Sequence, residues 1–423
     1  MSKRASSRSH TRRGKSAWLR HSERAFKSAL LPWVAHLFLP RTAASTPSLF
    51  DARRILLIRQ DNRLGNLVLL SPFLEALRRL APQAHIALLS GEAFADLFER
   101  CEWIDEHLIE RKRWFIRHPW AYPAHLRHIR GGRWEIAFEL SNADTHSFSQ
   151  TLHLAVSGAP LRVGFAHPSS RRVLNASVAA PAGECHYALA PLLLLSALGE
   201  RPPLLPLRLP SGLRLAATRA APSSAAREPF VLIHPGGRGP KGWSVERFAA
   251  LVASLREAGE KEILVVGGRS EEDRLLHLRD EGAQVRRLHG LVEFVALLSS
   301  ARLYVGCDAG PLHVAAAAGV PTVSLFLRSH PLRYAPLGDT HEALLLGVES
   351  RAWLERADQA RGEPAARRGD PTFAEVLRQM RPRMIAPPVG LDPLDEVAFV
   401  RQRVELALER SASITRPHPD DQA

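Results

Sequence analysis

The stretch from Phe230 to Phe326 decides the fold that we predict, because it contains two strand–loop–helix units. The first unit opens with FVLIHPGGRGPKGW at 230–243, and the second contains LYVGCDAGPLHVAAAAGVPTVSLF at 303–326. The run Val231–Ile233 is apolar and typical of a buried strand. It ends at Pro235-Gly236-Gly237, where the backbone turns and can approach a ligand closely.

Both units have the features of an anion site. Lys241 lies in the first loop, and Ser244 is placed to cap the helix that we predict over 245–258. In the second unit we predict a strand over 301–305, a tight loop over 306–311, a helix over 313–318 and a strand over 321–326. A glycine loop with a cation and a helix N-terminus favour anions. Both loops follow the carboxyl ends of their strands, and open α/β sheets bind ligands at these strand ends.

The first half of the chain begins in the same way. Apolar residues over 53–58 predict a parallel strand buried on both faces. A polar turn over 59–66 follows, and apolar residues at helical spacing predict a helix over 67–80. A further strand at 84–89 and a helix at 92–98 indicate a βαβ start.

These loops resemble those of the ADP-heptose:lipopolysaccharide heptosyltransferase family, which are GT-B glycosyltransferases. His234–Trp243 stands in the place of the family's PGA-x-x-x-x-KRWP-like loop. Gly306–His313 matches its GNDSGPMH-like loop, and Ile55–Pro72 matches its SLGD-x-x-L-x-x-P-like turn. The resemblance covers residues 53 to 345 in the right order. It implies an α/β protein of the GT-B fold, with two Rossmann-like domains whose parallel sheets face a central cleft.

The resemblance also implies an activity. It is that of an inverting glycosyltransferase that moves a sugar, heptose in the family, from an ADP-linked donor to lipopolysaccharide core or a related surface glycolipid. A non-catalytic sugar-nucleotide-binding homologue and a transferase with another nucleotide sugar stay open as alternatives. A Rossmann oxidoreductase is disfavoured, because no G-x-G-x-x-G motif follows Ile58. We expect no metal or other cofactor, since Lys241 and a helix dipole can compensate the charge of a diphosphate.

The turn after the first strand departs from the family at its catalytic aspartate. That position is Asn66, and an amide cannot act as a general base. Asp61 is the nearest carboxylate in the same loop, so we name Asp61 and Asn66 as the candidate catalytic residues. Asp61 is either the base or a residue that only shapes the turn. Asn66 is a candidate for orienting an acceptor hydroxyl.

The predicted donor-binding residues lie in loops and helix starts of the second half. They are Gly236, Gly237, Lys241, Glu272, Gly290, Leu291, Asp308, Ala309, Gly310, Pro311 and His313. Three of them have simpler alternatives. Asp308 can be a helix cap, His313 a packing residue, and Glu272 an acid that compensates a helix dipole instead of bonding a ribose.

The distribution of charge and the cysteine content indicate in which cellular compartment we expect the protein. Residues 1–50 hold ten Lys or Arg and one acid, so they carry +9 of the net charge of +14. This tail is either disordered or attached to an anionic membrane surface. It lacks a secretory cleavage site, and no nucleic-acid-binding module follows it. The three cysteines are widely separated, so we expect a cytoplasmic protein, with the cytoplasmic face of the inner membrane as its site of attachment.

We predict seven segments along the chain. They are a basic tail over 1–50, an N-terminal acceptor domain over 51–212, a linker over 213–229, a C-terminal nucleotide-sugar domain over 230–349, an insertion over 350–390, a C-terminal helix over 391–410 and a tail over 411–423. In GT-B folds a terminal helix commonly returns to the first domain, and we expect the same here. The segment 111–133 is basic and aromatic, and it is either a solvated surface or a surface that meets an acceptor or a membrane.

Overall fold

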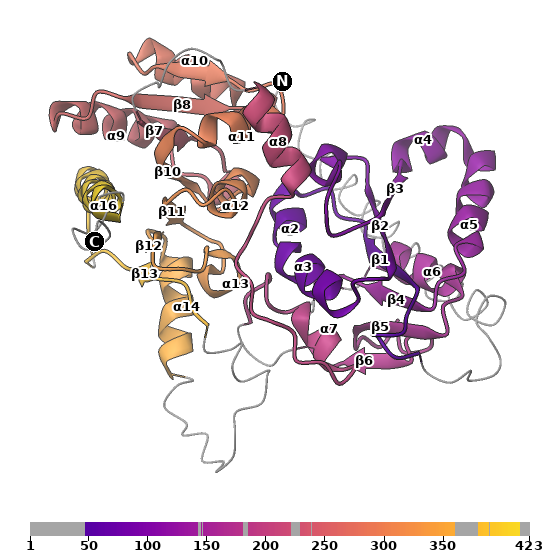
Figure 1. Cartoon of the computed structure of the whole chain (residues 1–423). Coiled ribbons are helices and arrows are strands. Elements are labelled where there is room, and N and C mark those ends of the chain that lie inside the picture. Colours follow the sequence, from indigo (N-terminus) through magenta and orange to yellow (C-terminus); the bar gives the residue numbers. More distant parts are fainter. Residues whose placement is uncertain are drawn as a thin grey trace, which may run out of the picture. The chain divides into compact units, whose positions relative to one another are not determined.

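The computed structural model describes residues 47–142, 145, 147–180, 185–220, 229–237, 239–359, 380–388 and 390–414. Contacts divide them into two compact units (Figure 1). Unit 1 contains the described residues up to 60, then 80–90 and 108–180. Unit 2 contains 61–79, 91–107 and the described residues after 180. The predicted attachment of the N-terminal tail falls on residues 1–46, outside the described part of the chain.

The first sheet has six strands in the order β3-β2-β1-β4-β5-β6. β1 pairs in parallel with β2 and β4, and β4, β5 and β6 continue in parallel. The strand bounds are β1 Arg54–Arg59, β2 His85–Gly91, β3 Glu106–Glu110, β4 Ile136–Glu139, β5 Leu161–Phe165 and β6 Ala176–Val178. This is the order of a doubly wound sheet, with its switch point between β1 and β4.

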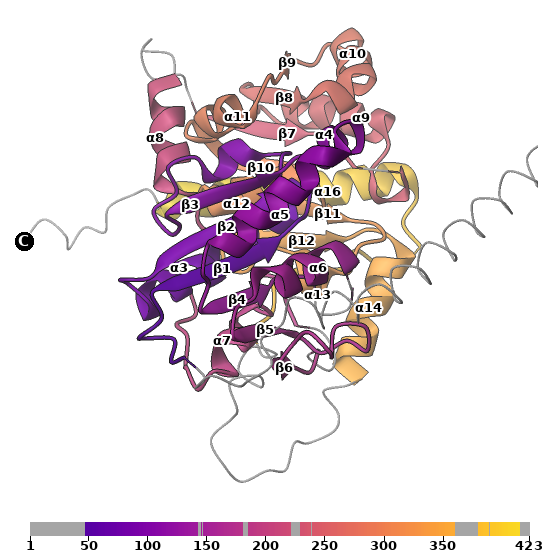
Figure 2. The same ribbon diagram turned by 90° about the vertical axis from the view of Figure 1, so that its right-hand side faces the viewer.

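One face of this sheet is covered by α5 (Tyr122–Gly131) and α6 (Phe148–Ser157), as Figures 1 and 2 show. Alternate strand residues such as Leu56 and Ile58 pack with Ile129 and Leu154 of these helices. Ahead of α5 lie α4 (Lys112–Arg117) and the short 3-10 helix η2 (Pro119–Ala121).

The predicted helix over 67–80 is wrong in its extent. The chain forms two helices, α2 (Leu64–Val68) and α3 (Ser71–Leu80). Pro72 lies in the first turn of α3, where its missing N–H needs no partner, so the proline fits a helix that begins here. The helix predicted over 92–98 is shorter, a 3-10 helix η1 over Ala95–Phe98.

The second sheet has seven strands in the order β13-β12-β11-β10-β7-β8-β9, and all of its pairs are parallel. The strand bounds are β7 Phe230–His234, β8 Ile263–Gly267, β9 Val285–Arg287, β10 Ala301–Cys307, β11 Thr322–Phe326, β12 His341–Leu345 and β13 Met384–Ile385. Its switch point lies between β7 and β10. These are the strands that precede the two loops quoted above.

Three helices build the core on one face of the second sheet. They are α9 (Val245–Glu257), α10 (Glu272–Asp280) and α16 (Pro393–Ile414). Their apolar residues pack on alternate strand residues such as Ile233, Val305 and Leu325. The other described helical elements after residue 180 are α7 Leu192–Ser196, α8 Ser211–Ala220, η3 Gly239–Lys241, η4 Arg269–Glu271, α11 Leu291–Leu298, α12 Gly310–Ala317, α13 Pro331–Tyr334 and α14 Val348–Gln359.

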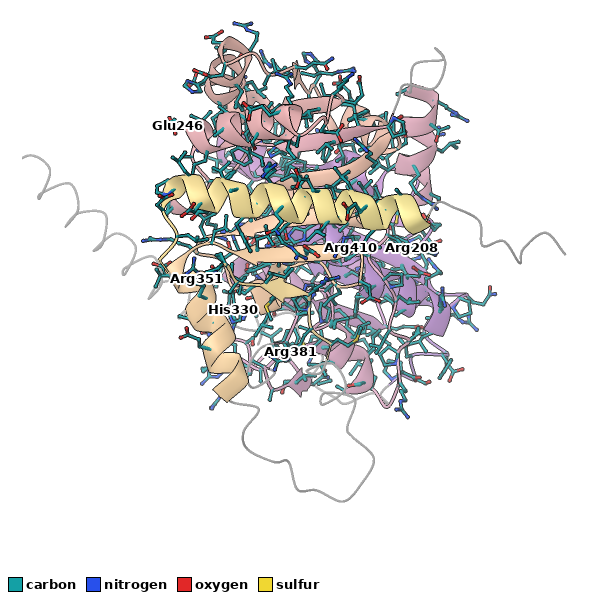
Figure 3. The ribbon with its side chains drawn as sticks, turned by 90° about the vertical axis from the view of Figure 1, so that its left-hand side faces the viewer. Arg208, Glu246, His330, Arg351, Arg381 and Arg410 are labelled. Carbon is teal, nitrogen blue, oxygen red and sulfur yellow. The ribbon has the colours of Figure 1, made fainter. Side chains whose placement is uncertain are left out.

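The structure corrects three expectations about the connections. The terminal helix was expected to return to the first domain, but α16 packs on α9 and the second sheet (Figure 3). Val400 and Val404 of this helix are fully buried there. The predicted linker over 213–229 contains most of helix α8. The predicted insertion over 350–390 contributes most of α14 and the edge strand β13, while residues 360–379 lie outside the described part.

Both sheets confirm the predicted α/β class with parallel sheets. Among the described residues, no helix combines the length and the apolar composition needed to cross a bilayer.

Candidate functional site

The two quoted loops leave neighbouring parallel strands of the second sheet. His234 at the end of β7 pairs in register with Gly306 near the end of β10. The backbone therefore brings the loop 235–243 and the loop 308–309 to the same sheet edge, at the switch point. This placement confirms the part of the prediction that rested on the order of strands and loops.

The glycine loop after β7 is folded back on itself and held from three sides. A Cβ atom on Gly237 would lie 2.4 Å from the Cα of Gly242, so the close approach of the two backbones requires glycine. Arg274 of α10 donates to the carbonyl oxygens of Pro235 and Trp243, at 2.7 and 2.8 Å. The Trp243 N–H donates to the Cys307 sulfur at 3.2 Å.

The buried Trp243 also ties the loop to the C-terminal helix. Its indole Nε1–H donates to the Glu396 carboxylate of α16 at 2.6 Å, and Arg247 lies 3.2 Å from the same carboxylate. Burial raises the pKa of the Cys307 thiol to about 12, so this sulfur stays protonated and serves as a packing and hydrogen-bonding atom. The predicted cap of α9 is confirmed, because the Ser244 hydroxyl accepts from the Arg247 N–H.

The loop carries its cation to an aspartate of the second loop. Lys241 Nζ lies 3.3 Å from Asp308 Oδ2 and 5.5 Å from the centroid of the Tyr334 ring. The Lys241 side chain keeps 45% of its surface exposed, whereas Asp308 keeps 7%. One partner is therefore fixed, and the cation stays open to a second anion.

His313 lies next to the other oxygen of the Asp308 carboxylate. Its Nε2 is 3.7 Å from Asp308 Oδ1, and its buried Nδ1 has no hydrogen-bond partner among the described residues. Burial alone raises the pKa of the Asp308 carboxyl, but His313 and Lys241 outweigh it, so the pKa is lower than that of a free aspartate. Asp308 is therefore a buried anion between two basic side chains.

The start of helix α12 is packed directly against the start of α2. A Cβ on Gly65 would lie 2.6 Å from the His313 ring, and a Cβ on Gly310 would lie 3.0 Å from the Cβ of Leu64. Ala309 is the N-cap of α12, and Pro311 lies in its first turn. The predicted residues of both halves thus come together at two helix N-termini.

The two candidate catalytic residues contact each other. Asp61 Oδ1 accepts from the Arg63 N–H at 3.0 Å, which is the turn-shaping role considered above. Its Oδ2 accepts from the Asn66 side-chain amide at 2.5 Å. Asp61 is partly exposed and Asn66 is buried. The Asn66 amide therefore holds the Asp61 carboxylate in place.

The acidic residue expected at the ribose position is placed differently. Glu272 forms an ion pair with Arg287 at 2.7 Å, and both side chains are about half exposed. Its neighbour Glu271 turns instead towards the glycine loop, 3.9 Å from His234 and bonded to the Gly268 N–H at 2.9 Å. Sequence reasoning missed Glu271 because two adjacent acids at a helix start look alike.

Other predicted residues begin helices or line the loop. Gly290 is the exposed N-cap of α11, and Leu291 is the buried first residue of that helix. Gly236 lies so close to His234 that a Cβ would come within 2.2 Å of the imidazole. Arg274 and Tyr334 were not predicted, since neither belongs to a glycine loop and only the fold brings them to it.

Comparisons with known proteins agree with this arrangement. The model of glycosyltransferase family 9 (heptosyltransferase) matches residues 124–362. Lipopolysaccharide heptosyltransferase 3 of Escherichia coli is 33% identical over 104 residues, which cover 23% of this chain and 31% of that protein. The protein of the same name from strain K12 is 28% identical over 107 residues, covering 24% and 31%. The matched segments span less than half of the curated relatives.

Solved structures share the fold. A glycosyl transferase family 9 protein from Veillonella parvula has a TM-score of 0.64 at 20% identity, covering 86% of this chain and all of that chain. The ADP-heptose lps heptosyltransferase II of E. coli has a TM-score of 0.58 at 20% identity, covering 83% and 99%. E. coli heptosyltransferase WaaC with ADP has a TM-score of 0.58 at 17% identity, covering 72% and 99%.

These likenesses confirm the predicted GT-B fold class. The family model spans more than half of the chain, and the chain belongs to glycosyltransferase family 9, the heptosyltransferase family.

Proposed function

We propose that this protein is an inverting glycosyltransferase that moves a sugar, in first choice heptose, from an ADP-linked donor to lipopolysaccharide core or a related surface glycolipid. The observation that carries the proposal is the meeting of the Lys241–Asp308–His313 cluster with the Asp61–Asn66 pair, through the contact of Gly65 with His313. One group compensates negative charge, and the other can accept a proton. Sugar transfer from a nucleotide needs both.

The donor side follows from charge. When the bond between the anomeric carbon and the diphosphate breaks, the electron pair leaves with the diphosphate. Lys241 is exposed enough to contact it, and the first N–H groups of α12 add a partial positive charge. The buried Asp308 carboxylate holds the lysine in place. The structures of WaaC with ADP and with ADP-2-deoxy-2-fluoro heptose support ADP as the donor nucleotide.

The acceptor side follows from the Asp61 carboxylate. A hydroxyl of the acceptor forms the new bond to the anomeric carbon, and its proton passes to Asp61. The Asn66 amide, which donates to Oδ2, is the positioning residue for this base. A single displacement of this kind inverts the anomeric configuration. A lipid-linked acceptor would be met at the anionic surface of the inner membrane, from its cytoplasmic face.

We also propose that transfer needs no metal ion, because Lys241 and the start of α12 supply the positive charge. Activity is then expected to persist in a chelator such as EDTA. The alternative function is sugar-nucleotide binding without transfer, and Asn66 at the usual place of an aspartate favours it.

Calorimetry with ADP-linked and UDP-linked sugars tests the donor. The wild type is expected to bind the ADP-sugar, and Lys241→Ala to bind it at least about tenfold more weakly, as for a lost charge-assisted contact. Lys261→Ala, an exposed lysine of the same unit, is the control. A preference for the UDP-sugar rejects the ADP donor, and no binding to either rejects the transferase.

A radiolabelled transfer assay tests the base. Asp61→Asn keeps the shape of the side chain but removes the proton acceptor, so turnover should fall by roughly a hundredfold or more while donor affinity is retained. Asp280→Asn, an exposed aspartate of α10, is the control. Full turnover by Asp61→Asn would show that Asp61 is not the base. Donor binding by a wild type that transfers no sugar would favour the non-catalytic alternative.

A further inference from the structure

The segment 111–130 of unit 1 presents apolar side chains to solvent. Trp114 is 43% exposed, Ile116 80% and Trp120 72%. The described residues include ten such exposed large hydrophobic side chains, and three of them lie within the seven positions 114–120. Large apolar groups that cluster at the surface mark interaction sites, whereas single ones are ordinary.

The other side of the same segment is packed in the ordinary way. The Phe115 ring contacts Tyr122 and His125, with centroids 5.2 and 5.0 Å apart. Ile129 of α5 is fully buried in the core of unit 1. The segment thus has its own inward apolar side. Trp114, Ile116 and Trp120 do not belong to this inward side, so an incomplete core does not explain their exposure.

The exposed rings are held in a fixed arrangement. The His118 ring stacks on the Trp114 ring with the two centroids 4.7 Å apart. It contacts the Trp120 ring edge-on, with a centroid distance of 5.3 Å. Its Nδ1 also lies 3.0 Å from the Trp114 carbonyl oxygen. Exposed tryptophans on a flexible loop would collapse onto the surface, whereas these two are supported by one imidazole between them.

The charge around these side chains has one sign. Residues 111–134 contain seven Lys or Arg and no Asp or Glu. The basic residues Arg111, Lys112, Arg117, Arg127 and Arg130 are exposed. Lys112 reaches back to Glu110 at 3.7 Å, outside the segment. We call Trp114, Ile116 and Trp120 with these five basic residues the basic aromatic face. Figure 2 shows two of the elements that carry it, α4 and α5, in front of the strands of the first sheet.

We propose that the basic aromatic face docks unit 1 onto an anionic lipid bilayer. Tryptophan rings favour the boundary between headgroups and acyl chains, and basic side chains are attracted to anionic headgroups. Nucleic acid would match the charge and the rings, but stacking gives no role to Ile116, which is the most exposed of the three and is aliphatic. Insertion of the Ile116 side chain into the hydrocarbon of a bilayer gives it a role. The proposal locates the membrane contact of the proposed function in this element and does not depend on the transfer chemistry.

A site-specific probe tests this in the full chain. Cys101, Cys185 and Cys307 are buried, so a cysteine introduced by Ile116→Cys can be labelled selectively with an environment-sensitive fluorophore. Val348→Cys, at a position 81% exposed in unit 2, is the matched control. The probes are vesicles of phosphatidylcholine alone and of an equimolar mixture with phosphatidylglycerol. The emission of the label at 116 should shift to the blue with the mixed vesicles only, and the label at 348 should not respond.

Charge reversal gives a second readout with unlabelled protein. Arg117→Glu should lower the partition onto the mixed vesicles by about tenfold or more, and Arg171→Glu, an exposed arginine of the same unit, should lower it less. Circular dichroism confirms that both variants are folded. Partition unchanged by Arg117→Glu would contradict the proposal.

Three other outcomes would also contradict the proposed membrane contact. Sedimentation with the vesicles without a shift at 116 would assign binding to another part of the chain, such as the basic N-terminal tail, and overturn the proposal. Equal shifts at 116 and 348 would mean insertion without specificity, with the same consequence. A response at 116 to single-stranded RNA and not to vesicles would assign the face to nucleic acid. Because no donor is present, each of these results leaves the proposed transfer reaction untouched.

Discussion

At the scale of single residues, Gly65 has no room for a side chain. A Cβ there would come within 2.6 Å of the His313 ring, which is buried and fixed beside Asp308. His313 cannot yield without disturbing the carboxylate that holds Lys241. Gly65 is therefore expected to set the spacing between the proposed base and the proposed donor site.

Gly65→Ala should lower kcat/KM for transfer by roughly tenfold to a hundredfold, as for a displacement of catalytic groups by up to an ångström. Gly131→Ala in α5 is the control, because a Cβ at Gly131 meets nothing within 4 Å. Both changes favour the helix in which they lie by up to about 1 kcal/mol, so lost helicity cannot explain a lower rate. Equal rates for the two variants would contradict this role.

A second residue-scale feature is the buried carboxyl of Glu139 at the end of β4. Burial raises its pKa to about 7, although the hydroxyls of Ser141 and Thr151 donate to it and act in the opposite direction. The folded protein therefore holds a proton here that the unfolded chain, with a pKa near 4.5, releases. Stability from this proton is complete below about pH 4.5 and is lost as the pH rises to about 7.

Urea unfolding of wild type and Glu139→Gln at several pH values measures this effect. The amide does not titrate, so the free energy of unfolding of wild type relative to the variant should fall by about 3 kcal/mol between pH 4.5 and 7.5. Glu92→Gln, at an exposed carboxyl, should show a much smaller change. A difference between wild type and Glu139→Gln that stays constant over this range would show that Glu139 ionises as it does in the unfolded chain.

At the scale of elements, the glycine loop depends on helix α10. Arg274 donates to the carbonyl oxygens at both ends of the loop, those of Pro235 and Trp243. A buried carbonyl left without a donor costs about 1–3 kcal/mol. The loop that carries Lys241 is thus held by a residue of a neighbouring helix.

Arg274→Ala should weaken binding of the ADP-sugar by about tenfold and speed amide hydrogen exchange within 235–243. Arg279→Ala is the control, since this arginine lies on the same helix, is 59% exposed and contacts the neighbouring Asp280. The exchange readout separates a loosened loop from a lost ligand contact, because it is measured without ligand. Unchanged exchange in Arg274→Ala would show that the loop is held without it.

The C-terminal helix shows how an element can be predicted while its place is not. Val397, Val400 and Val404 recur at helical spacing, and the helix α16 forms as expected. Its apolar side covers the second sheet, however (Figure 3). Its Arg403 and Arg410 bind the buried Glu342 of β12. Spacing specifies an apolar face but carries no information about which of two sheets that face covers.

At the scale of the whole molecule, the chain crosses between its two units several times. Residues 61–79 and 91–107 belong by contacts to the unit that contains the second sheet, although their neighbours in sequence build the first sheet. The predicted boundary at 212 describes the order of the two sheets along the chain. It does not describe the contacts, since the start of α2 is packed on the start of α12.

The sequence by itself determined the two parallel sheets, the glycine loops and most helix starts, because these depend on local apolar spacing, turn residues and caps. It also identified Lys241, Asp308 and His313 as one group, since loops after adjacent parallel strands must meet. Only the tertiary structure decided that Asn66 donates to Asp61, that Glu271 and not Glu272 faces the glycine loop, and that α16 stays with the second sheet. These outcomes depend on side-chain direction and on contacts between distant segments, for which periodicity along the chain contains no signal.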